Sequence, residues 1–131
     1  MQLIILASGR GSRLKKLTSK IPKCLVKIRS KTIIDYIYEN FKKFNQTIIL
    51  TGYQSNLINN KFPKLKKIKN KKYMTTNMVY SLFCSKKYIN QDVIISYSDI
   101  IYDHKIIDKM INLNKTHIPL NNKWLSLWKK E

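Results

Sequence analysis

The sequence predicts an α/β fold, in which helices cover both faces of a mostly parallel β-sheet to form a three-layer sandwich. Short apolar runs alternate along the chain with segments whose apolar residues recur at helical spacing, and no internal repeat is present. Such alternation is typical of a parallel sheet with crossover helices. The length of 131 residues fits one ordinary domain, so we expect residues 1–131 to form a single folding unit.

Four apolar runs are predicted to be strands, namely residues 3–6, 47–50, 65–68 and 92–96. The first ends in a turn that contains Gly9 and Gly11, and the second is closed by Gly52. The last run is apolar on both faces, as expected of a strand that lies between two layers of helices. Ligands bind at the carboxyl ends of such strands, so the residues that follow them are candidate site residues.

Three segments with helical spacing are predicted to be helices. They cover residues 32–44, residues 77–87 and a segment that starts after Asp103 and runs to about Asn114. The first would pack on the sheet through Ile33, Ile34, Ile37, Phe41 and Phe44.

The charge of the chain is unusual, with 26 Lys and Arg against 7 Asp and Glu and a formal net charge of +19. Such a surface attracts nucleic acid, anionic membranes or phosphorylated small molecules. Residues 61–72 hold seven lysines interleaved with Phe62, Leu65 and Ile68. This segment could be a polyanion patch, but we favour a solvated strand and loop in a chain that is rich in lysine throughout. A basic nucleic-acid-binding module is therefore kept only as an alternative.

Other patterns exclude further classes of protein. No apolar run approaches the roughly 20 residues that span a bilayer, and the first residues lack the features of a secretory signal, so we expect a cytoplasmic location. Cys24 and Cys84 lie outside any CxxC or Cys/His cluster. The sequence therefore indicates two reduced cysteines, without a disulfide framework or a zinc site.

The most informative segment is residues 3–28. Glycines in the turn after the first strand let the backbone approach a bound group closely, and successive N–H groups there can form an anion-binding nest. Two standard motifs do not match, because Leu14 replaces the third glycine of the dinucleotide fingerprint and no P-loop Gly-Lys-Ser/Thr occurs. Residues 10–23 contain six cations and no acid, so this loop should attract anions such as phosphate.

Residues 6–23 read L-A-S-G-R-G-S-R-L, then L-T, then P-K. This pattern closely resembles the N-terminal motif of the sugar-nucleotidyltransferase superfamily, including its bacterial phosphocholine cytidylyltransferase-like branch. The resemblance implies a Rossmann-like fold and a Mg²⁺-dependent transfer of a nucleotidyl group from a nucleoside triphosphate to a phosphorylated acceptor, with release of pyrophosphate. It favours CTP or another pyrimidine nucleotide, and phosphocholine or a sugar 1-phosphate as the acceptor.

The resemblance also implies roles for individual residues. Leu6 and Ala7 would lie near the base, while Arg13 and Lys23 would act in catalysis by contacting the reacting triphosphate. This agrees with their chemistry, because Arg holds phosphate oxygens bidentately and Lys is a compact point charge. The alternative for Lys23 is an exposed lysine among many. The residues expected to bind the nucleotide are Leu6, Ala7, Ser8, Gly9, Gly11, Ser12, Arg13, Lys23, Thr76 and Asn77.

The interpretation also includes a candidate metal ligand and a pair of polar residues beside the nucleotide. Asp99 should emerge at the carboxyl end of an apolar strand, where a carboxylate can bind Mg²⁺ together with substrate phosphates, and the resemblance also implies a metal ligand there. The alternative is a turn or N-cap residue, a role that Asp103 fits better. Thr76 and Asn77 lie in a segment that resembles one which opens a helix beside the nucleotide, and either would also serve as a plain N-cap.

The resemblance extends through residues 124–128, where Trp124 and Trp128 are interpreted as core or acceptor-side packing. Lys16 replaces a proline that the family usually has. The family's domain also continues well beyond this length and supplies a second acidic metal ligand and most of the acceptor pocket. We therefore expect a truncated sheet and the nucleotide-binding half of the enzyme, with a catalytically incomplete nucleotide-binding fragment as the alternative. An uncovered sheet edge or apolar face would favour self-association.

Overall fold

The computed structural model describes residues 1–40, 44–113 and 115–129. The chain divides into two compact units, Met1–Ile101 and Tyr102–Glu131. The first unit contains all of the strands in the described part of the chain and every residue predicted to bind the nucleotide or the metal.

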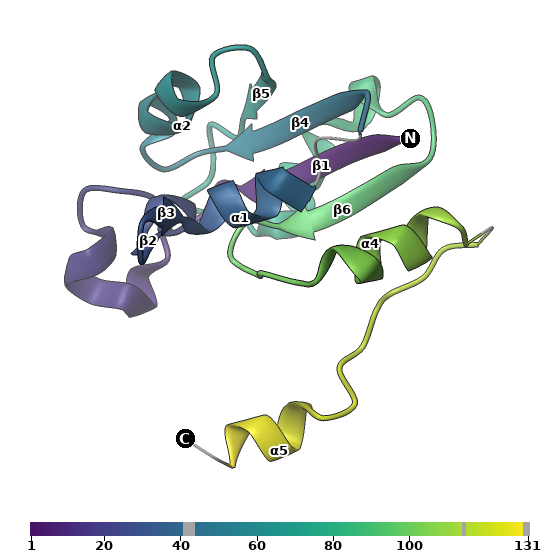
Figure 1. Ribbon diagram of the computed structural model, residues 1–131. Coiled ribbons are helices and arrows are strands. Elements are labelled where there is room, and N and C mark those ends of the chain that lie inside the picture. The colour runs from purple at the N-terminus through teal and green to yellow at the C-terminus, as the bar shows by residue number, and fades with distance from the viewer. Residues whose placement is uncertain (41–43, 114, 130–131) are drawn as a thin grey trace. The chain divides into compact units, whose positions relative to one another are not determined.

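The first unit is built on a four-stranded sheet with the order β5-β4-β1-β6 (Figure 1). Its strands are β1 (Gln2–Ala7), β4 (Gln46–Thr51), β5 (Lys66–Lys69) and β6 (Val93–Tyr97). Every pair is parallel, and Leu6 lies opposite Leu50 on one side and Tyr97 on the other. The prediction of an α/β fold with a parallel sheet is confirmed, and the carboxyl ends of these strands meet at one edge.

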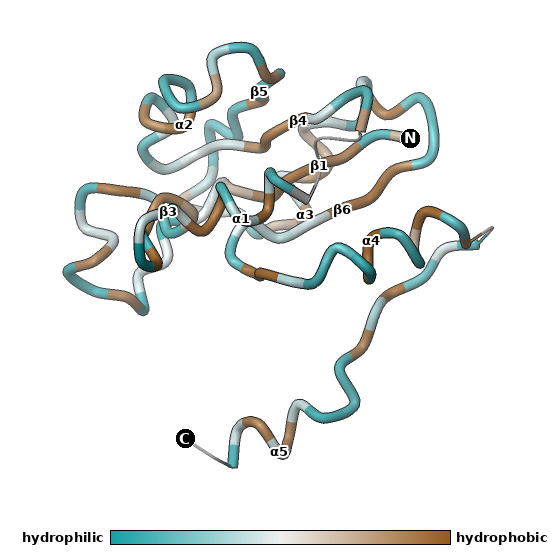
Figure 2. Tube along the Cα trace, in the orientation of Figure 1, coloured by the Kyte–Doolittle hydropathy of each residue, from teal (hydrophilic) through white to brown (hydrophobic). Residues whose placement is uncertain are grey.

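Strand β1 lies between β4 and β6, and Figure 2 shows hydrophobic residues running along β1 and β6. Leu3, Ile4 and Ile5 are fully buried. One face of the sheet packs against residues that follow β5, including Leu82 of α3 (Met78–Phe83) and Tyr88 of the short 3₁₀ helix Lys86–Tyr88. On the opposite face lies α1 (Ile33–Asn40), and α2 (Ser55–Lys61) adds the fully buried Ile58.

The predicted helices are present but shorter than expected. Phe41, which was assigned to the buried face of the first helix, lies outside the described residues, and Phe44 is not helical. The expected helix 77–87 is divided into α3 and a 3₁₀ turn. Asp103 is the N-cap of helix α4 (His104–Ile111), and its side chain accepts a hydrogen bond from the Lys105 N–H at 2.8 Å, so the N-cap role is confirmed. Asn114 lies outside the described residues.

Short elements fill the connection from β1 to α1, where the sequence predicted only a loop. Two 3₁₀ helices, Ser12–Thr18 and Lys23–Leu25, precede an antiparallel pair formed by β2 (Lys27–Ile28) and β3 (Lys31–Thr32).

The prediction that the last strand is buried on both faces is wrong. Strand β6 is at the edge of the sheet, and Ile95 and Tyr97 on one of its faces are 45% and 42% exposed, whereas Ile94 and Ser96 on the other are buried. The opposite edge strand, β5, carries three lysines, a common protection of edges against further pairing. Strand β6 carries no charge. An apolar edge is therefore exposed, and self-association remains a prediction.

The second unit contains α4 and α5 (Trp124–Trp128). The rings of Trp124 and Trp128 contact each other edge to face with centroids 5.8 Å apart, and both side chains are exposed. Neither ring is therefore a core residue, and the alternative of packing on the acceptor side stays a prediction. No helix in the described segments has the length and apolar character that crossing a membrane requires.

Asp35 joins the start of α1 to the end of α2. Its carboxylate accepts hydrogen bonds from the N–H and hydroxyl of Thr32, at 2.9 and 2.6 Å, and pairs with Lys61 at 2.7 Å. The Thr32-x-x-Asp35 pattern resembles a capping box. Partial burial raises the pKa of Asp35, but the hydrogen bonds from Lys61 and Thr32 outweigh this effect, so the pKa lies below its ordinary value of 3.8.

We predict that Asp35→Asn lowers the free energy of unfolding at neutral pH by about 1 kcal/mol, because a charge near a helix N-terminus and its bond to Lys61 are lost. A carboxyl whose pKa is lowered by folding stabilises the protein above its unfolded pKa, and this contribution disappears as the pH falls through the folded pKa. Urea denaturation should therefore show a deficit at neutral pH that shrinks below pH 3.8. Glu39→Gln, in an exposed pair with Lys31, is the control and should change little. If Asp35→Asn lowers the free energy of unfolding equally at neutral pH and below pH 3.8, the stabilising role of the Asp35 carboxylate is contradicted.

Candidate functional site

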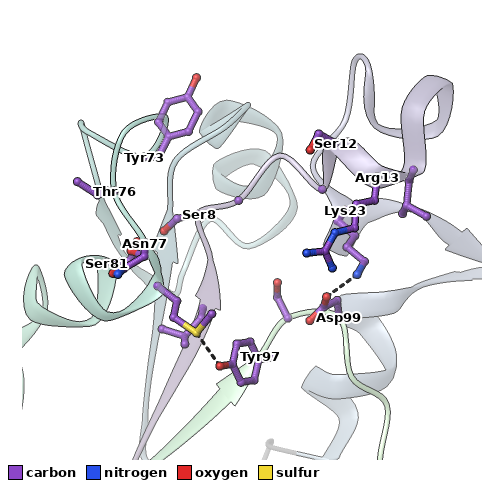
Figure 3. Close-up of a pocket in the computed structure, with 16 residues that line it drawn as sticks. Ser8, Ser12, Arg13, Lys23, Tyr73, Thr76, Asn77, Ser81, Tyr97 and Asp99 are labelled. Atoms are coloured by element: carbon purple, nitrogen blue, oxygen red, sulfur yellow. Dashed lines mark hydrogen bonds and ion pairs between the residues drawn. The ribbon is translucent and has the colours of Figure 1, made fainter.

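A pocket of about 620 Å³ lies at the carboxyl ends of β1 and β6 (Figure 3). Its wall is formed by the loop after β1, the loop and helix start after β5, and the residues that end β6. The lining residues are Leu6, Ser8, Gly9, Gly11, Ser12, Arg13, Leu14, Lys23, Tyr73, Thr76, Asn77, Met78, Ser81, Tyr97, Ser98 and Asp99.

Gly11 fixes the shape of the loop after β1. Its φ of 73° lies in the left-handed region, and a Cβ at this position would lie 2.7 Å from Cβ of Lys23. The Gly11 carbonyl accepts hydrogen bonds from the Leu14 N–H at 3.0 Å and from the buried Thr18 hydroxyl at 2.8 Å. Only glycine combines this backbone conformation with the close approach of Lys23.

Gly9 has a different environment, because no heavy atom lies within 4 Å of the position that its Cβ would occupy. Gly9 is one of the lining residues, so this open space adjoins the pocket. A side chain at position 9 would collide with no other residue but would occupy space that a ligand could use. Gly9 therefore leaves room for a bound group beside the backbone.

The charged end of the pocket is formed by Arg13, Lys23 and Asp99, the three charged residues among its lining. Nζ of Lys23 lies 2.6 Å from a carboxylate oxygen of Asp99, and their side chains are 39% and 28% exposed. Figure 3 shows the side chains of Arg13 and Lys23 reaching toward Asp99 from the same side. With two cations and one carboxylate, this end carries a net positive charge and suits an anion.

Cys24 anchors Lys23 but takes no part in the chemistry of the pocket. The side chain of Cys24 is 1% exposed, and burial raises the pKa of its thiol to about 12. A thiol with that pKa is neutral at pH 7 and is not a nucleophile. In the described part of the chain Cys24 and Cys84 are free cysteines.

The other end of the pocket is neutral and rich in hydrogen-bonding groups. Asn77 is the N-cap of α3, and its side-chain oxygen accepts from the Tyr80 N–H at 3.0 Å, so the capping interpretation is confirmed for Asn77. The Ser81 side chain is buried in the wall. The Ser8 hydroxyl is buried without a hydrogen-bond partner among the described residues, an unusual state for a polar atom that suggests a ligand contact.

Gly52 lets the end of β1 meet the loop after β5. A Cβ on Gly52 would lie 2.5 Å from the Ser8 carbonyl oxygen and 2.6 Å from Cβ of Tyr73. The same Ser8 carbonyl accepts a hydrogen bond from the Tyr53 N–H at 3.0 Å. This contact brings Tyr73 to the neutral end of the pocket.

The structure brings together all of the predicted site residues except Ala7, which lies on the opposite face of β1 and is 3% exposed. Sequence reasoning missed Leu14, Tyr73, Met78, Ser81, Tyr97 and Ser98 as lining residues. The hydroxyl of Tyr97 contacts the sulfur of Met78 at 2.6 Å and so joins the end of β6 to α3. Tyr97 and Ser98 directly precede Asp99, so the argument that selected Asp99 could have selected them too.

Comparisons with known proteins identify the family of this chain. Residues 2–123 match the family model for nucleotidyl transferase. The chain is 39% identical to the CTP:phosphoglutamine cytidylyltransferase of Campylobacter jejuni over 142 aligned positions. This alignment covers 99% of the present chain and 56% of that protein. It is 33% identical to the choline-phosphate cytidylyltransferase of Streptococcus pneumoniae over 107 positions, or 78% of this chain and 46% of that protein.

A solved structure of the CTP:phosphocholine cytidylyltransferase from Streptococcus pneumoniae superposes with a TM-score of 0.69 at 33% identity, over 75% of this chain and 44% of the other. The chain thus spans about half the length of the curated relatives it matches. The resemblance that the residue 6–23 motif indicated is confirmed, and the chain belongs to the nucleotidyl transferase family.

Proposed function

We propose that this chain forms the nucleotide-binding part of a cytidylyltransferase, which transfers the cytidylyl group of CTP to a phosphorylated small molecule and releases pyrophosphate. The division of the pocket into a cationic end and a neutral hydrogen-bonding end carries the proposal. A nucleoside triphosphate is divided in the same way, since its phosphates are anionic and its base is neutral. The choice of CTP is supported by the two relatives, whose names specify cytidylyl transfer to phosphoglutamine and to choline phosphate.

In this reaction an oxygen of the acceptor phosphate attacks the α-phosphorus, a new P–O bond forms, and the bond to the leaving pyrophosphate breaks. Positioning and charge neutralisation are the main requirements. Arg13 would hold phosphate oxygens through its planar guanidinium, and Lys23 would neutralise charge at the α-phosphate. The acceptor phosphate is already anionic at neutral pH, so no general base is required. Lys23 now pairs with Asp99, and its ammonium has three hydrogens to donate, so it could also contact a phosphate oxygen when the nucleotide binds.

We further propose that Asp99 holds Mg²⁺. The proposal is supported by the position of Asp99, whose carboxylate lines the pocket and already pairs with a cation, the Lys23 ammonium, at 2.6 Å. No group of three or more His, Cys, Asp or Glu side chains gathers anywhere in the described ranges, so the remaining ligands would come from phosphate oxygens and water. Mg²⁺ commonly binds in this way, through one or two carboxylates and a substrate phosphate. When bound, the ion would supply further positive charge to the phosphates.

The acceptor and the cellular location are also proposals. Phosphocholine, phosphoglutamine or a sugar 1-phosphate would meet the nucleotide at the Lys23 and Asp99 end of the pocket. Because the chain spans about half of its relatives, binding without turnover is the second candidate for this chain alone. Two free cysteines and a nucleoside triphosphate substrate support a cytoplasmic location.

We predict that CTP with Mg²⁺ raises the thermal midpoint of the wild-type chain more than UTP, dTTP, GTP or ATP does, because at equal concentration the ligand that binds the native state most tightly stabilises it most. Arg13→Ala should lose most of this shift. Arg29→Asn is a matched control that removes one cation outside the pocket, and asparagine tolerates the left-handed backbone found there. Equal losses in the two variants would indicate general attraction of anions and contradict a specific site.

We also predict that alanine has different effects at the two glycines of the loop. Gly11→Ala should lower both stability and CTP affinity, because its Cβ collides with Lys23 and its φ is positive. Gly9→Ala should leave stability nearly unchanged and lower CTP affinity by about tenfold or more, since the methyl group fills ligand space. Calorimetric titration and urea denaturation measure the two quantities separately. Wild-type affinity in Gly9→Ala would show that the phosphates do not lie against this backbone.

A further inference from the structure

Asn70 lies directly behind the neutral end of the pocket, at the carboxyl end of β5, and is 1% exposed. Its backbone N–H donates to the Thr51 carbonyl at 2.8 Å, which ties it to the end of β4. Its side-chain oxygen accepts from the Lys72 N–H at 2.8 Å. Its side-chain nitrogen donates to the hydroxyls of Thr76 and Ser81, each at 2.9 Å. Both hydrogens of the amide nitrogen are used, so this nitrogen has no further hydrogen to donate.

The direction of these hydrogen bonds is forced by chemistry. A backbone N–H can only donate, so the Asn70 atom that faces Lys72 must be the oxygen, and the nitrogen must face the two hydroxyls. Because the nitrogen can only donate, both hydroxyls accept from it. Each hydroxyl then directs its own hydrogen to a carbonyl, Thr76 to that of Lys72 at 2.7 Å and Ser81 to that of Asn77 at 3.3 Å.

This arrangement sets the hydrogen-bonding character of the pocket wall. A hydroxyl has one hydrogen and two lone pairs. With its hydrogen donated to a carbonyl and one lone pair facing Asn70, each hydroxyl has only an acceptor left to offer. Thr76 and Ser81 both line the pocket, so a ligand that faces them must present a hydrogen-bond donor.

From this network, and building on the proposed function, we infer that Asn70 is a positioning residue that selects cytosine over uracil. Cytosine carries an exocyclic amino group, a donor, at the position where uracil carries a carbonyl oxygen, an acceptor. A wall that can only accept hydrogen bonds pairs with the amino group of cytosine. The carbonyl oxygen of uracil would instead face the lone pairs of the two hydroxyls and find no donor. Buried polar groups without partners are costly, so such a wall discriminates well between the two bases. Asn70 touches neither base and acts through Thr76 and Ser81.

The selection of cytosine through Asn70 is tested by titration calorimetry with CTP and with UTP, each with Mg²⁺. The proteins compared are the wild type, Asn70→Leu and Gln2→Met. Asn70→Leu keeps the approximate volume and removes the amide, which frees both hydroxyls to donate. Gln2→Met is the matched control, because Gln2 is a fully buried amide bonded to Gln46 and to the Tyr88 carbonyl at the amino end of β1. We expect the wild type to prefer CTP by about tenfold or more. We expect this ratio to collapse toward one in Asn70→Leu, with triphosphate binding retained, and to persist in Gln2→Met.

The outcomes separate the inference from the proposed function. An unchanged CTP:UTP ratio in Asn70→Leu, or a wild type that binds both nucleotides equally, would overturn the inference and leave the nucleotide site in place. A wild type that binds neither would overturn the proposed function and the inference with it. If Asn70→Leu does not fold, Thr76→Val provides the measurement, since it removes one acceptor from a half-buried position. The CTP:UTP ratio should fall in that variant, and an unchanged ratio would contradict the inference.

Discussion

The parallel pairing of β1 between β4 and β6 is the constraint on which the rest of the first unit depends. It brings the ends of three strands to one edge of the sheet, and backbone hydrogen bonds continue the alignment beyond the strands. The Ser98 N–H donates to the Leu6 carbonyl, and the Tyr53 N–H donates to the Ser8 carbonyl. The loops that follow these strands therefore start from fixed positions, and residues far apart in the sequence form one pocket.

Within that pocket, two local contacts determine which end is charged and which end is neutral. Close approach of Lys23 to Gly11 holds a cation beside Asp99, and close approach of Tyr73 to Gly52 holds the loop after β5 against the end of β1. The first contact produces a charged end and the second a neutral one. Neither approach tolerates a Cβ on the glycine, so two small residues determine where charge and neutral hydrogen-bonding groups are placed.

The sequence allowed much of this arrangement to be predicted, because its strongest signals are local. Apolar runs located all four strands of the sheet to within one residue at each end, and the motif around Gly9 and Gly11 identified the charged end of the pocket. Asp99 followed from its position after a strand. The same reasoning, applied to the strand predicted at residues 65–68, would have drawn attention to Asn70, which follows it closely.

The remaining features depend on tertiary structure. The exposure of Ile95 and Tyr97 follows from the place of β6 at the sheet edge, which an apolar run alone does not reveal. Ala7 belongs to the motif but faces away from the pocket, because side chains alternate along a strand. Tyr73 lines the pocket because it packs closely against Gly52. These two residues are 21 positions apart, and no local sequence pattern predicts their contact.

Hydrogen exchange measured by mass spectrometry, with and without CTP and Mg²⁺, tests the central claim that this pocket binds the nucleotide. The account predicts slower exchange at residues 9–13, 71–77 and 97–99, which come from three separate loops and meet only at the carboxyl edge of the sheet. Exchange in the lysine-rich residues 61–69 should not change. Slowing confined to residues 61–69, or absent from all three loops, would contradict the account.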